Sequence, residues 1–208
     1  MLEEFQPVFP IPKRIETKRL TLRQFDRSDA EEYYDLEQEG LRLHLSEFIP
    51  GAVSTAPRNA GISEMREKIR TTVGRWDDGT EFRFIIREKN NSPIIGQIGI
   101  TNAIRNVAQS AFIGYWIGHG HLGQGYATEA TAAMLGFAFD VIRLHRISIW
   151  ISTENVASLR VVEKLRLRFE GTALRALYQG GKWTDTHIFA ITSEEWNIRK
   201  NEFQALYL

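Results

Sequence analysis

The stretch that most constrains the fold is Gly114–Ala130, which reads GYWIGHGHLGQGYATEA. It predicts a short apolar strand over Ala111–Ile117, a glycine-rich turn over Gly118–Gly125, and a helix that begins near Tyr126. The turn contains no proline and no side chain of the type that caps a helix, so the first amide groups of the helix lack an obvious partner. Such amides, at the positive end of a helix dipole, favour a phosphate. The turn therefore predicts either a site for a phosphorylated ligand or a tight connection that merely needs glycine.

Length and composition predict one globular domain of 208 residues with a real core, because 43% of the residues are hydrophobic. The 26 basic and 26 acidic residues cancel, which argues against a nucleic-acid partner bound by bulk charge. Cysteine is absent, so thiolate metal sites and cysteine nucleophiles are excluded. No apolar run is long enough for a membrane span, and Met1–Pro12 has no signal-peptide features. We expect an N-terminal arm over residues 1–14, a domain over 15–208 and a cytoplasmic location.

The order of the predicted elements indicates an α/β fold with a mixed sheet and helices on both faces. Three strands with short links precede the glycine turn and predict an antiparallel meander. The predicted strands are Arg19–Phe25, Glu81–Arg87, Ile94–Thr101, Ala111–Ile117, His145–Ile151, Phe169–Tyr178 and Lys182–Ile191. The predicted helices are Ala30–Glu39 after a cap at Ser28 or Asp29, one from Asn59 or Ser63 to Trp76, one from Tyr126, Val156–Leu165 after a cap at Asn155, and a short one from Ser193.

Residues Gly118–Gly123 also match the dinucleotide-binding pattern GxGxxG, which raises the alternative of an NAD(P)-dependent oxidoreductase. That pattern needs an acidic residue about 20 positions further on, at the end of the next strand. The first acid after that strand is Glu154, about ten positions too far. A P-loop is excluded, because no Gly-Lys-Ser/Thr follows the glycines.

Two segments together resemble the acyl-CoA signature of the GNAT N-acetyltransferase superfamily: LGQGYA at Leu122–Ala127 and NVAS at Asn155–Ser158. Further stretches resemble the branch of ribosomal-protein N-terminal (alanine/serine) acetyltransferases. These are Thr17–Arg23, Ile113–Ile117, Gly123–Ala130, Asn155–Leu165 and Phe169–Gly171. The resemblance runs from about Ile15 to Ile191. It implies a GNAT-like fold with splayed central strands, and direct transfer of an acetyl group from acetyl-CoA to a primary amine in a ternary complex.

The resemblance also assigns roles. The backbone at Trp116–Gly118 would pair with pantetheine and polarise the thioester, Asn155 would bind the pantetheine arm, and Ser158 would donate to the sulfur. Plain helix capping also accounts for Asn155 and Ser158, although the two motifs together favour the functional interpretation. The implied cofactor-binding residues are Trp116, Ile117, Gly118, Leu122, Gly123, Gln124, Gly125, Tyr126, Ala127, Thr128, Asn155 and Ser158, with Ser158 and Asn155 as catalytic candidates and no metal.

Three positions depart from the family pattern. Gly120 stands where the glycine motif has Gln or Arg, and Val162 stands where many GNAT enzymes have the tyrosine that protonates the CoA thiolate. Arg166 replaces the usual glycine after the helix that begins near Asn155. Because glycine at that position serves a left-handed turn, Arg166 predicts local strain or an altered helix end.

The general base and the acceptor stay open. Candidate bases are Glu47, Glu81, Asp185 and His187, or water alone, with Tyr115 and Tyr178 as possible relays. The segment Ala30–Thr80 would wall the acceptor site by family analogy. The acceptor is a protein N-terminus or a small amine, and the enzyme is expected to form a homodimer or act alone. A non-catalytic CoA-sensing module is the alternative from another functional class.

Overall fold

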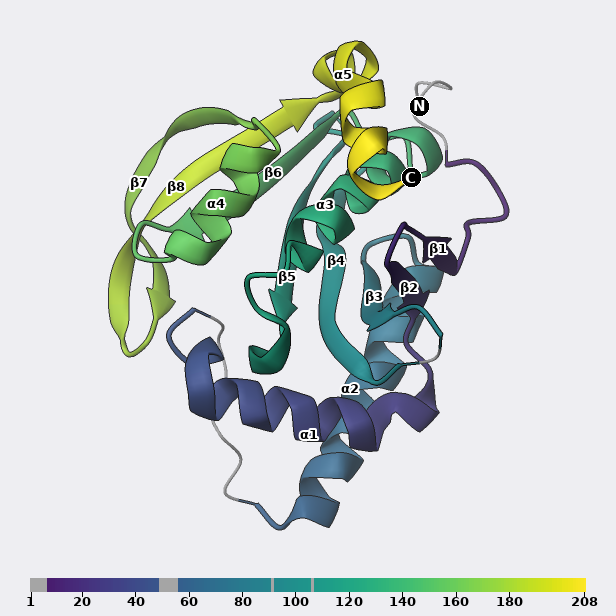
Figure 1. Cartoon of the computed structure of the whole chain (residues 1–208), viewed down its shortest axis with the longest axis vertical. Coiled ribbons are helices and arrows are strands. Elements are labelled where there is room, and N and C mark those ends of the chain that lie inside the picture. Colours follow the sequence, from purple (N-terminus) through teal and green to yellow (C-terminus); the bar gives the residue numbers. More distant parts are fainter. Residues whose placement is uncertain (1–6, 49–55, 91, 106) are drawn as a thin grey trace.

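The computed structural model describes residues 7–48, 56–90, 92–105 and 107–208. Its centre is a sheet of eight strands in the order β1-β2-β3-β4-β5-β6-β8-β7 (Figure 1). The strands are β1 (Arg14–Glu16), β2 (Leu20–Gln24), β3 (Phe82–Glu88), β4 (Ile94–Ile104), β5 (Ser110–Ile117), β6 (Arg146–Ser152), β7 (Arg168–Gln179) and β8 (Lys182–Thr192). These bounds confirm the predicted strands and add the short β1.

All neighbouring strands are antiparallel except β5 and β6, which are parallel. The predicted meander of β3, β4 and β5 is confirmed, and so is the mixed sheet. The chain reaches β6 from β5 through α3, so the one parallel pair is joined by a helical crossover, as parallel neighbours require.

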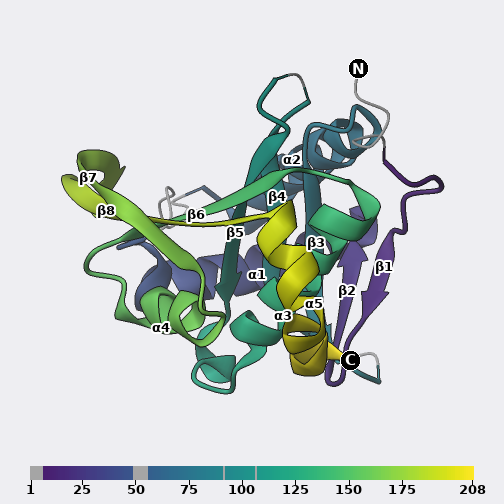
Figure 2. The same ribbon diagram turned by 90° about the horizontal axis from the view of Figure 1, so that it is seen from above.

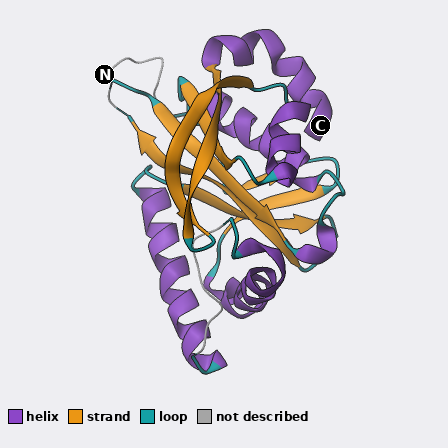
Figure 3. Cartoon of the chain, turned by 90° about the vertical axis from the view of Figure 1, so that its left-hand side faces the viewer, coloured by secondary structure: helices purple, strands orange, loops and turns teal. Residues whose placement is uncertain are grey.

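Helices cover both faces of the sheet (Figures 2 and 3). They are α1 (Ala30–Gly40), α2 (Arg58–Asp77), α3 (Tyr126–Gly136), α4 (Val156–Lys164) and α5 (Ser193–Tyr207). One hydrophobic cluster joins the sheet to α3, α4 and α5, and a second joins it to α1 and α2. Strand β5 belongs to both: Ile113 and Ile117 face the first cluster and Trp116 faces the second, as the alternation of a strand requires.

The predicted helix starts at Tyr126, Val156 and Ser193 are confirmed, and the starts of α1 and α2 differ in detail. Asp29 occupies the N-cap position of α1, as one of the two predictions had it, but its side chain makes no capping hydrogen bond to that helix. Its carboxylate instead completes a capping box with Asp26, which caps the 3-10 turn before α1. Helix α2 begins at Arg58, ahead of the predicted Asn59 or Ser63, and Pro57 occupies its N-cap position with an extended ψ of 139°. Helix α5 is long rather than short, and it starts with a capping box between Thr192 and Glu195.

The end of α4 shows how the chain accommodates Arg166. The residue adopts a left-handed φ of 49° directly after the helix, so the local strain expected from the missing glycine is present. Arg199 of α5 donates to the carbonyl oxygens of Leu165 and Arg166, both at 2.9 Å. These two hydrogen bonds satisfy carbonyls that a helix end otherwise leaves unpaired.

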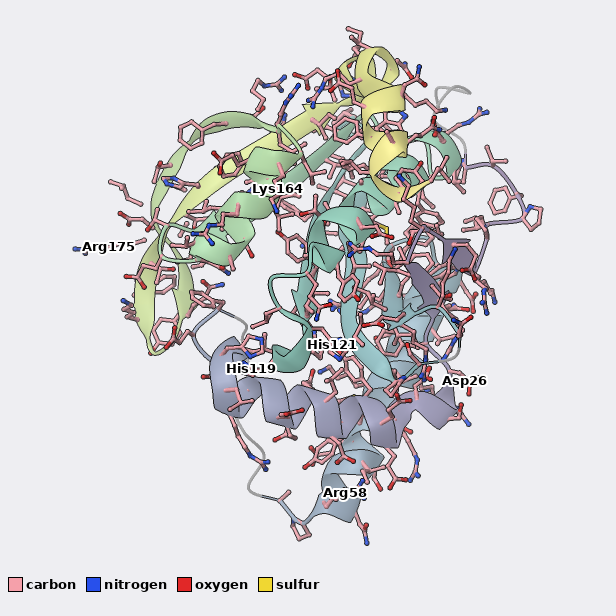
Figure 4. The ribbon with its side chains drawn as sticks, viewed as in Figure 1. Asp26, Arg58, His119, His121, Lys164 and Arg175 are labelled. Atoms are coloured by element: carbon pink, nitrogen blue, oxygen red, sulfur yellow. The ribbon has the colours of Figure 1, made fainter. Side chains whose placement is uncertain are left out.

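We expect Arg166→Gly to raise the free energy of unfolding by roughly 0.5 to 1 kcal/mol. Glycine removes the left-handed penalty, and the larger entropy of the unfolded chain offsets part of the gain. Denaturant unfolding measures the effect. Lys164→Gly, at the exposed last turn of α4 (Figure 4), is the control and should lower stability by about 1 kcal/mol. An unchanged or lower stability of Arg166→Gly would contradict the strain.

Candidate functional site

The split between β5 and β6 is the main feature of the site. Residues 110–112 of β5 pair with residues 146–148 of β6, and no further pairs form. Beyond that point β5 continues to Ile117, fully laddered to β4, while β6 continues to Ser152, laddered to β8. The two strands therefore diverge (Figure 1). Gly114 is exposed at the start of the split, and a Cβ there would meet no atom within 4 Å.

The open edge of β5 carries backbone groups that pair with neither β4 nor β6. The Gly118 amide donates to Ile95 of β4 at 2.7 Å, so Gly118 and, two residues earlier, Trp116 direct their backbone groups to β4. Because neighbouring residues of a strand point these groups to opposite edges, Tyr115 and Ile117 direct theirs into the split. The sequence suggested that the backbone of Trp116–Gly118 pairs with pantetheine. Of these three residues, Ile117 alone directs its backbone groups to the open edge.

The glycine turn ends β5 and opens α3 beside the split. Gly123 and Gly125 have φ values of 73° and 82°, which side chains with a Cβ rarely adopt. Gly125 is the residue before α3, and no side chain of the described residues caps the helix. Helix α3 is buried almost all round, so its first turn is held firmly against the sheet. The amides of Tyr126, Ala127 and Thr128 are thereby presented as an anion-binding end.

The N-terminus of α4 lies at the end of β6. The Asn155 side chain accepts from the Ser158 amide at 3.0 Å, which is the capping role that the sequence allowed. The Asn155 amide in turn donates to the Ser152 carbonyl at 2.9 Å. The cap fixes where α4 begins and therefore where the Ser158 hydroxyl stands.

Tyr115 brings a buried hydroxyl from β5 to Ser158. Burial raises the pKa of Tyr115 to about 12, and the neighbouring Ser158 side chain opposes that rise. The approach falls short of a hydrogen bond of ordinary geometry, and the Tyr115 hydroxyl has no such partner among the described residues. Sequence reasoning gave Tyr115 only as a relay, because nothing in the sequence shows that β5 and α4 meet here. The structure thus places a tyrosine beside Ser158, which lies one helical turn before Val162 in α4.

The segment that follows α1 also contacts the strands around the split. After α1 the chain forms a π-helical turn, η3 (Leu41–Leu45). His44 Nε2 lies 3.0 Å from the Ile117 carbonyl oxygen; since a carbonyl only accepts, Nε2 carries the proton. His44 Nδ1 is buried without a hydrogen-bond partner among the described residues. The sequence prediction missed His44, because the stretch after α1 showed no pattern.

The tip of the β7–β8 hairpin closes the other side. Gln179 Nε2 donates to the Phe48 carbonyl at 2.8 Å, and a Cβ on Gly180 would stand 3.5 Å from the Glu47 carbonyl. Gly180 has a φ of 56°, so glycine suits both the turn and the close approach. Glu47 is exposed beside this contact. Among the four candidate bases it is the one next to η3 and the hairpin tip.

The other three candidate bases lie elsewhere. Glu81 is buried between Arg75 and Arg83 and lines a cavity of about 240 Å³ beneath α2. Asp185 accepts from the Arg175 amide at 2.8 Å within the hairpin. His187 faces Thr172 of β7, with 2.8 Å between Nδ1 and the hydroxyl oxygen. Strand β6 separates β8 from the split, so these side chains serve the hairpin or the α2 layer.

The histidines of the turn point to different neighbours (Figure 4). The His119 ring lies 5.5 Å from the His44 ring, and His121 Nδ1 lies 3.1 Å from Glu88 Oε1. Across residues 7–48, 56–90, 92–105 and 107–208, no group of three or more His, Cys, Asp or Glu side chains is arranged to hold a metal ion. No helix in the same ranges is long and apolar enough to cross a membrane.

The geometry of the split sheet and the glycine turn agrees with the comparisons to known proteins. Residues 19–168 match the family model of the acetyltransferase (GNAT) domain. The chain is 30% identical over 178 residues to the probable N-acetyltransferase YjcK of Bacillus subtilis, covering 86% of this chain and 96% of that one. It is 28% identical over 118 residues to the [ribosomal protein uS5]-alanine N-acetyltransferase of Escherichia coli, covering 57% and 61%.

Solved structures show the same fold. The structure of Mycobacterium smegmatis RimJ in complex with CoA-disulfide has a TM-score of 0.81 and 26% identity, covering 91% of both chains. The chain belongs to the GNAT acetyltransferase family. The predicted fold and the predicted acetyl-transferring enzyme class are therefore confirmed, and the oxidoreductase alternative is removed.

Two buried tyrosines allow a test of the site without any ligand. Tyr115→Phe removes a hydroxyl that has no partner, so the melting temperature should stay unchanged or rise. Tyr33→Phe is the matched control. Its hydroxyl, on α1, donates to Gln97 of β4, and its loss should lower stability by about 1 to 2 kcal/mol. A comparable loss in Tyr115→Phe would show that its hydroxyl supports the fold.

Proposed function

We propose that the protein is an N-acetyltransferase that uses acetyl-CoA as co-substrate and transfers the acetyl group directly to a primary amine in a ternary complex. The observation that carries the proposal is the split between β5 and β6, which opens beside an uncapped helix N-terminus. An extended ligand with amide groups and a pyrophosphate at one end fits this pair of features. The related RimJ of Mycobacterium smegmatis was solved with CoA-disulfide, which supports the same class of ligand here.

In this proposal the pyrophosphate binds the turn from Leu122 to Gly125 and the first amides of α3. Pantetheine then runs along β5 from its C-terminal end toward Gly114. The backbone groups of Tyr115 and the amide of Ile117 pair with its amides, because the β4 side of the strand is already used and His44 already donates to the Ile117 carbonyl. Gly114 leaves room for the ligand at the inner end of the split.

In the proposed reaction the leaving thiolate receives its proton from Ser158 of α4, which is supplied in turn by Tyr115 of β5. The amine nitrogen forms a bond to the thioester carbon, the carbon–sulfur bond breaks, and the electron pair stays on sulfur. Ser158 donates its hydroxyl proton to sulfur, and Tyr115 donates its proton to Ser158. The amine loses one proton to solvent through the acceptor side, and the Tyr115 phenolate recovers one. Burial keeps Tyr115 protonated before the reaction, since it raises the pKa of the hydroxyl.

The acceptor enters on the side of η3 and the β7–β8 tip. Glu47 is exposed there, and a carboxylate suits a cationic amine before it loses its proton. The relative that acetylates ribosomal protein uS5 supports a protein N-terminus as the acceptor, with small amines as the second class. A cytoplasmic location and pairing with a second copy stay predictions.

Calorimetric titration with acetyl-CoA tests the co-substrate. The protein should bind acetyl-CoA and CoA but not NADH. Gly123→Val should abolish this binding, because valine disfavours the left-handed φ and a side chain blocks approach to the backbone. Gly79→Val, at a left-handed turn after α2, is the control for folding effects and should bind normally. Wild-type affinity in a folded Gly123→Val protein would overturn the pyrophosphate assignment.

The thiolate assignment predicts a loss of turnover without a loss of binding. Ser158→Ala should lower kcat about 10- to 100-fold on an amine panel, while the acetyl-CoA Kd changes little. Tyr115→Phe should do the same, and the double variant should lose no more than the worse single one, because both groups serve one proton path. Ser193→Ala, in the first turn of α5, is the control. A CoA-sensing module predicts binding without turnover on any amine, and no effect of these changes.

A further inference from the structure

The side chains of the glycine turn offer little positive charge to balance a bound pyrophosphate. The turn contains no lysine or arginine, and Gly120 stands where related motifs have Gln or Arg. The first turn of α3 carries Glu129, an acid at the end of the helix proposed to bind a pyrophosphate. Two like charges this close repel unless a cation stands between them.

Arg19 supplies that cation from the turn between β1 and β2. Its Nε donates to Glu129 Oε2 at 2.6 Å, and its backbone amide donates to Glu129 Oε1 at 2.9 Å. The Thr17 hydroxyl adds a third hydrogen bond to the same carboxylate, at 2.7 Å. Thr17 and Glu129 are each 4% exposed. The carboxylate is therefore buried, satisfied and paired with the guanidinium, as a buried charge requires.

The rest of the guanidinium lies over the glycine turn. Arg19 Nη1 donates to the Gln124 carbonyl at 2.9 Å, and the guanidinium carbon stands 4.6 Å from the centre of the Tyr126 ring. Nη2 is the atom nearest to a Cβ built on Gly125, at 3.5 Å. No residue in the described part of the chain accepts a hydrogen bond from Nη2, and 46% of the side chain is exposed. One donor of a fixed cation thus remains for a ligand at the turn.

We propose that Arg19 is the cation of the pyrophosphate subsite: Glu129 and Thr17 lock its guanidinium in place, and Nη2 donates to the pyrophosphate beside the α3 amides. The proposal rests on the proposed function, since it names a binding residue for the same co-substrate. It explains how this chain does without a side chain at Gly120. It also gives the hydrogen bonds of Thr17 and Arg19 to Glu129 a role, because they hold the guanidinium at the glycine turn.

The experiment is calorimetric titration of CoA and of 3′-dephospho-CoA into the wild type and Arg19→Gln. Arg19→Gln should weaken the Kd of both ligands by roughly 10- to 100-fold, the range for a charge-assisted hydrogen bond. Equal losses place the contact on the pyrophosphate. A loss confined to CoA would place it on the 3′-phosphate and overturn the proposal, as would an unchanged Kd for both. Arg14→Gln, which removes an exposed ion pair with Glu16 in β1, should leave both Kd values unchanged.

A second variant separates charge from folding. Arg19→Gln leaves Glu129 buried without its ion-pair partner and lowers stability, so the double variant Arg19→Gln/Glu129→Gln is measured beside it. The double variant should recover much of the melting temperature and keep the weak Kd, because it restores neutrality without restoring the cation. Recovery of the wild-type Kd would overturn the proposal, because it would show that Arg19 acts by neutralising Glu129 or by supporting the fold and not through a hydrogen bond from Nη2. If the wild type itself fails to bind CoA, the proposed function fails; if it binds and Arg19→Gln binds equally, only this proposal fails.

Discussion

The open edge of β5 is the constraint on which the rest of the structure depends. A strand that leaves its partner partway loses hydrogen bonds, and such groups are rarely left without partners inside a protein. Here the loss is tolerated because β5 keeps its full ladder to β4, and β6 keeps its ladder to β8. At the C-terminal end of β5, His44 donates a hydrogen bond to the Ile117 carbonyl. The remaining edge groups suit an extended ligand that completes the sheet as an added strand would.

The position of the glycine turn is fixed from two sides. Helix α3 is buried between the sheet and α5. This packing fixes the direction of its axis and the position of its first turn. Glu129 and Arg19 tie that first turn to the β1–β2 connection. The N-terminal strands, which lie far from the turn in the sequence, therefore hold it in place. An anion-binding end made of backbone amides is only as precise as the helix that carries it, so this support is part of the site.

The sequence predicted the strands, the meander and the helix after the turn, because their apolar periodicity and glycine positions are local signals. It did not predict which titratable groups come together, because that depends on which edge and which face each strand presents. Glu81 looked like a base candidate, yet it pairs with Arg75 and Arg83 beneath α2. Tyr115 and Ser158 are far apart in the chain, and only the crossover of α3 and the start of α4 bring them together. The box between Asp26 and Asp29 was missed because Asp is not the usual second partner of such a box.

In the proposed function the site has a co-substrate half and an acceptor half, and the two are built from different kinds of structure. The co-substrate half consists of buried strands and helices whose side chains the core already fixes. The acceptor half consists of η3 and the tip of a long hairpin, where Tyr178 and Trp183 form an edge-to-face pair and both remain more than half exposed. Changes at this tip leave the ladder between β5 and β4 untouched. If the acceptor enters as proposed, the choice of amine is physically separable from the chemistry of the thioester, because the hairpin tip and η3 lie apart from the split between β5 and β6.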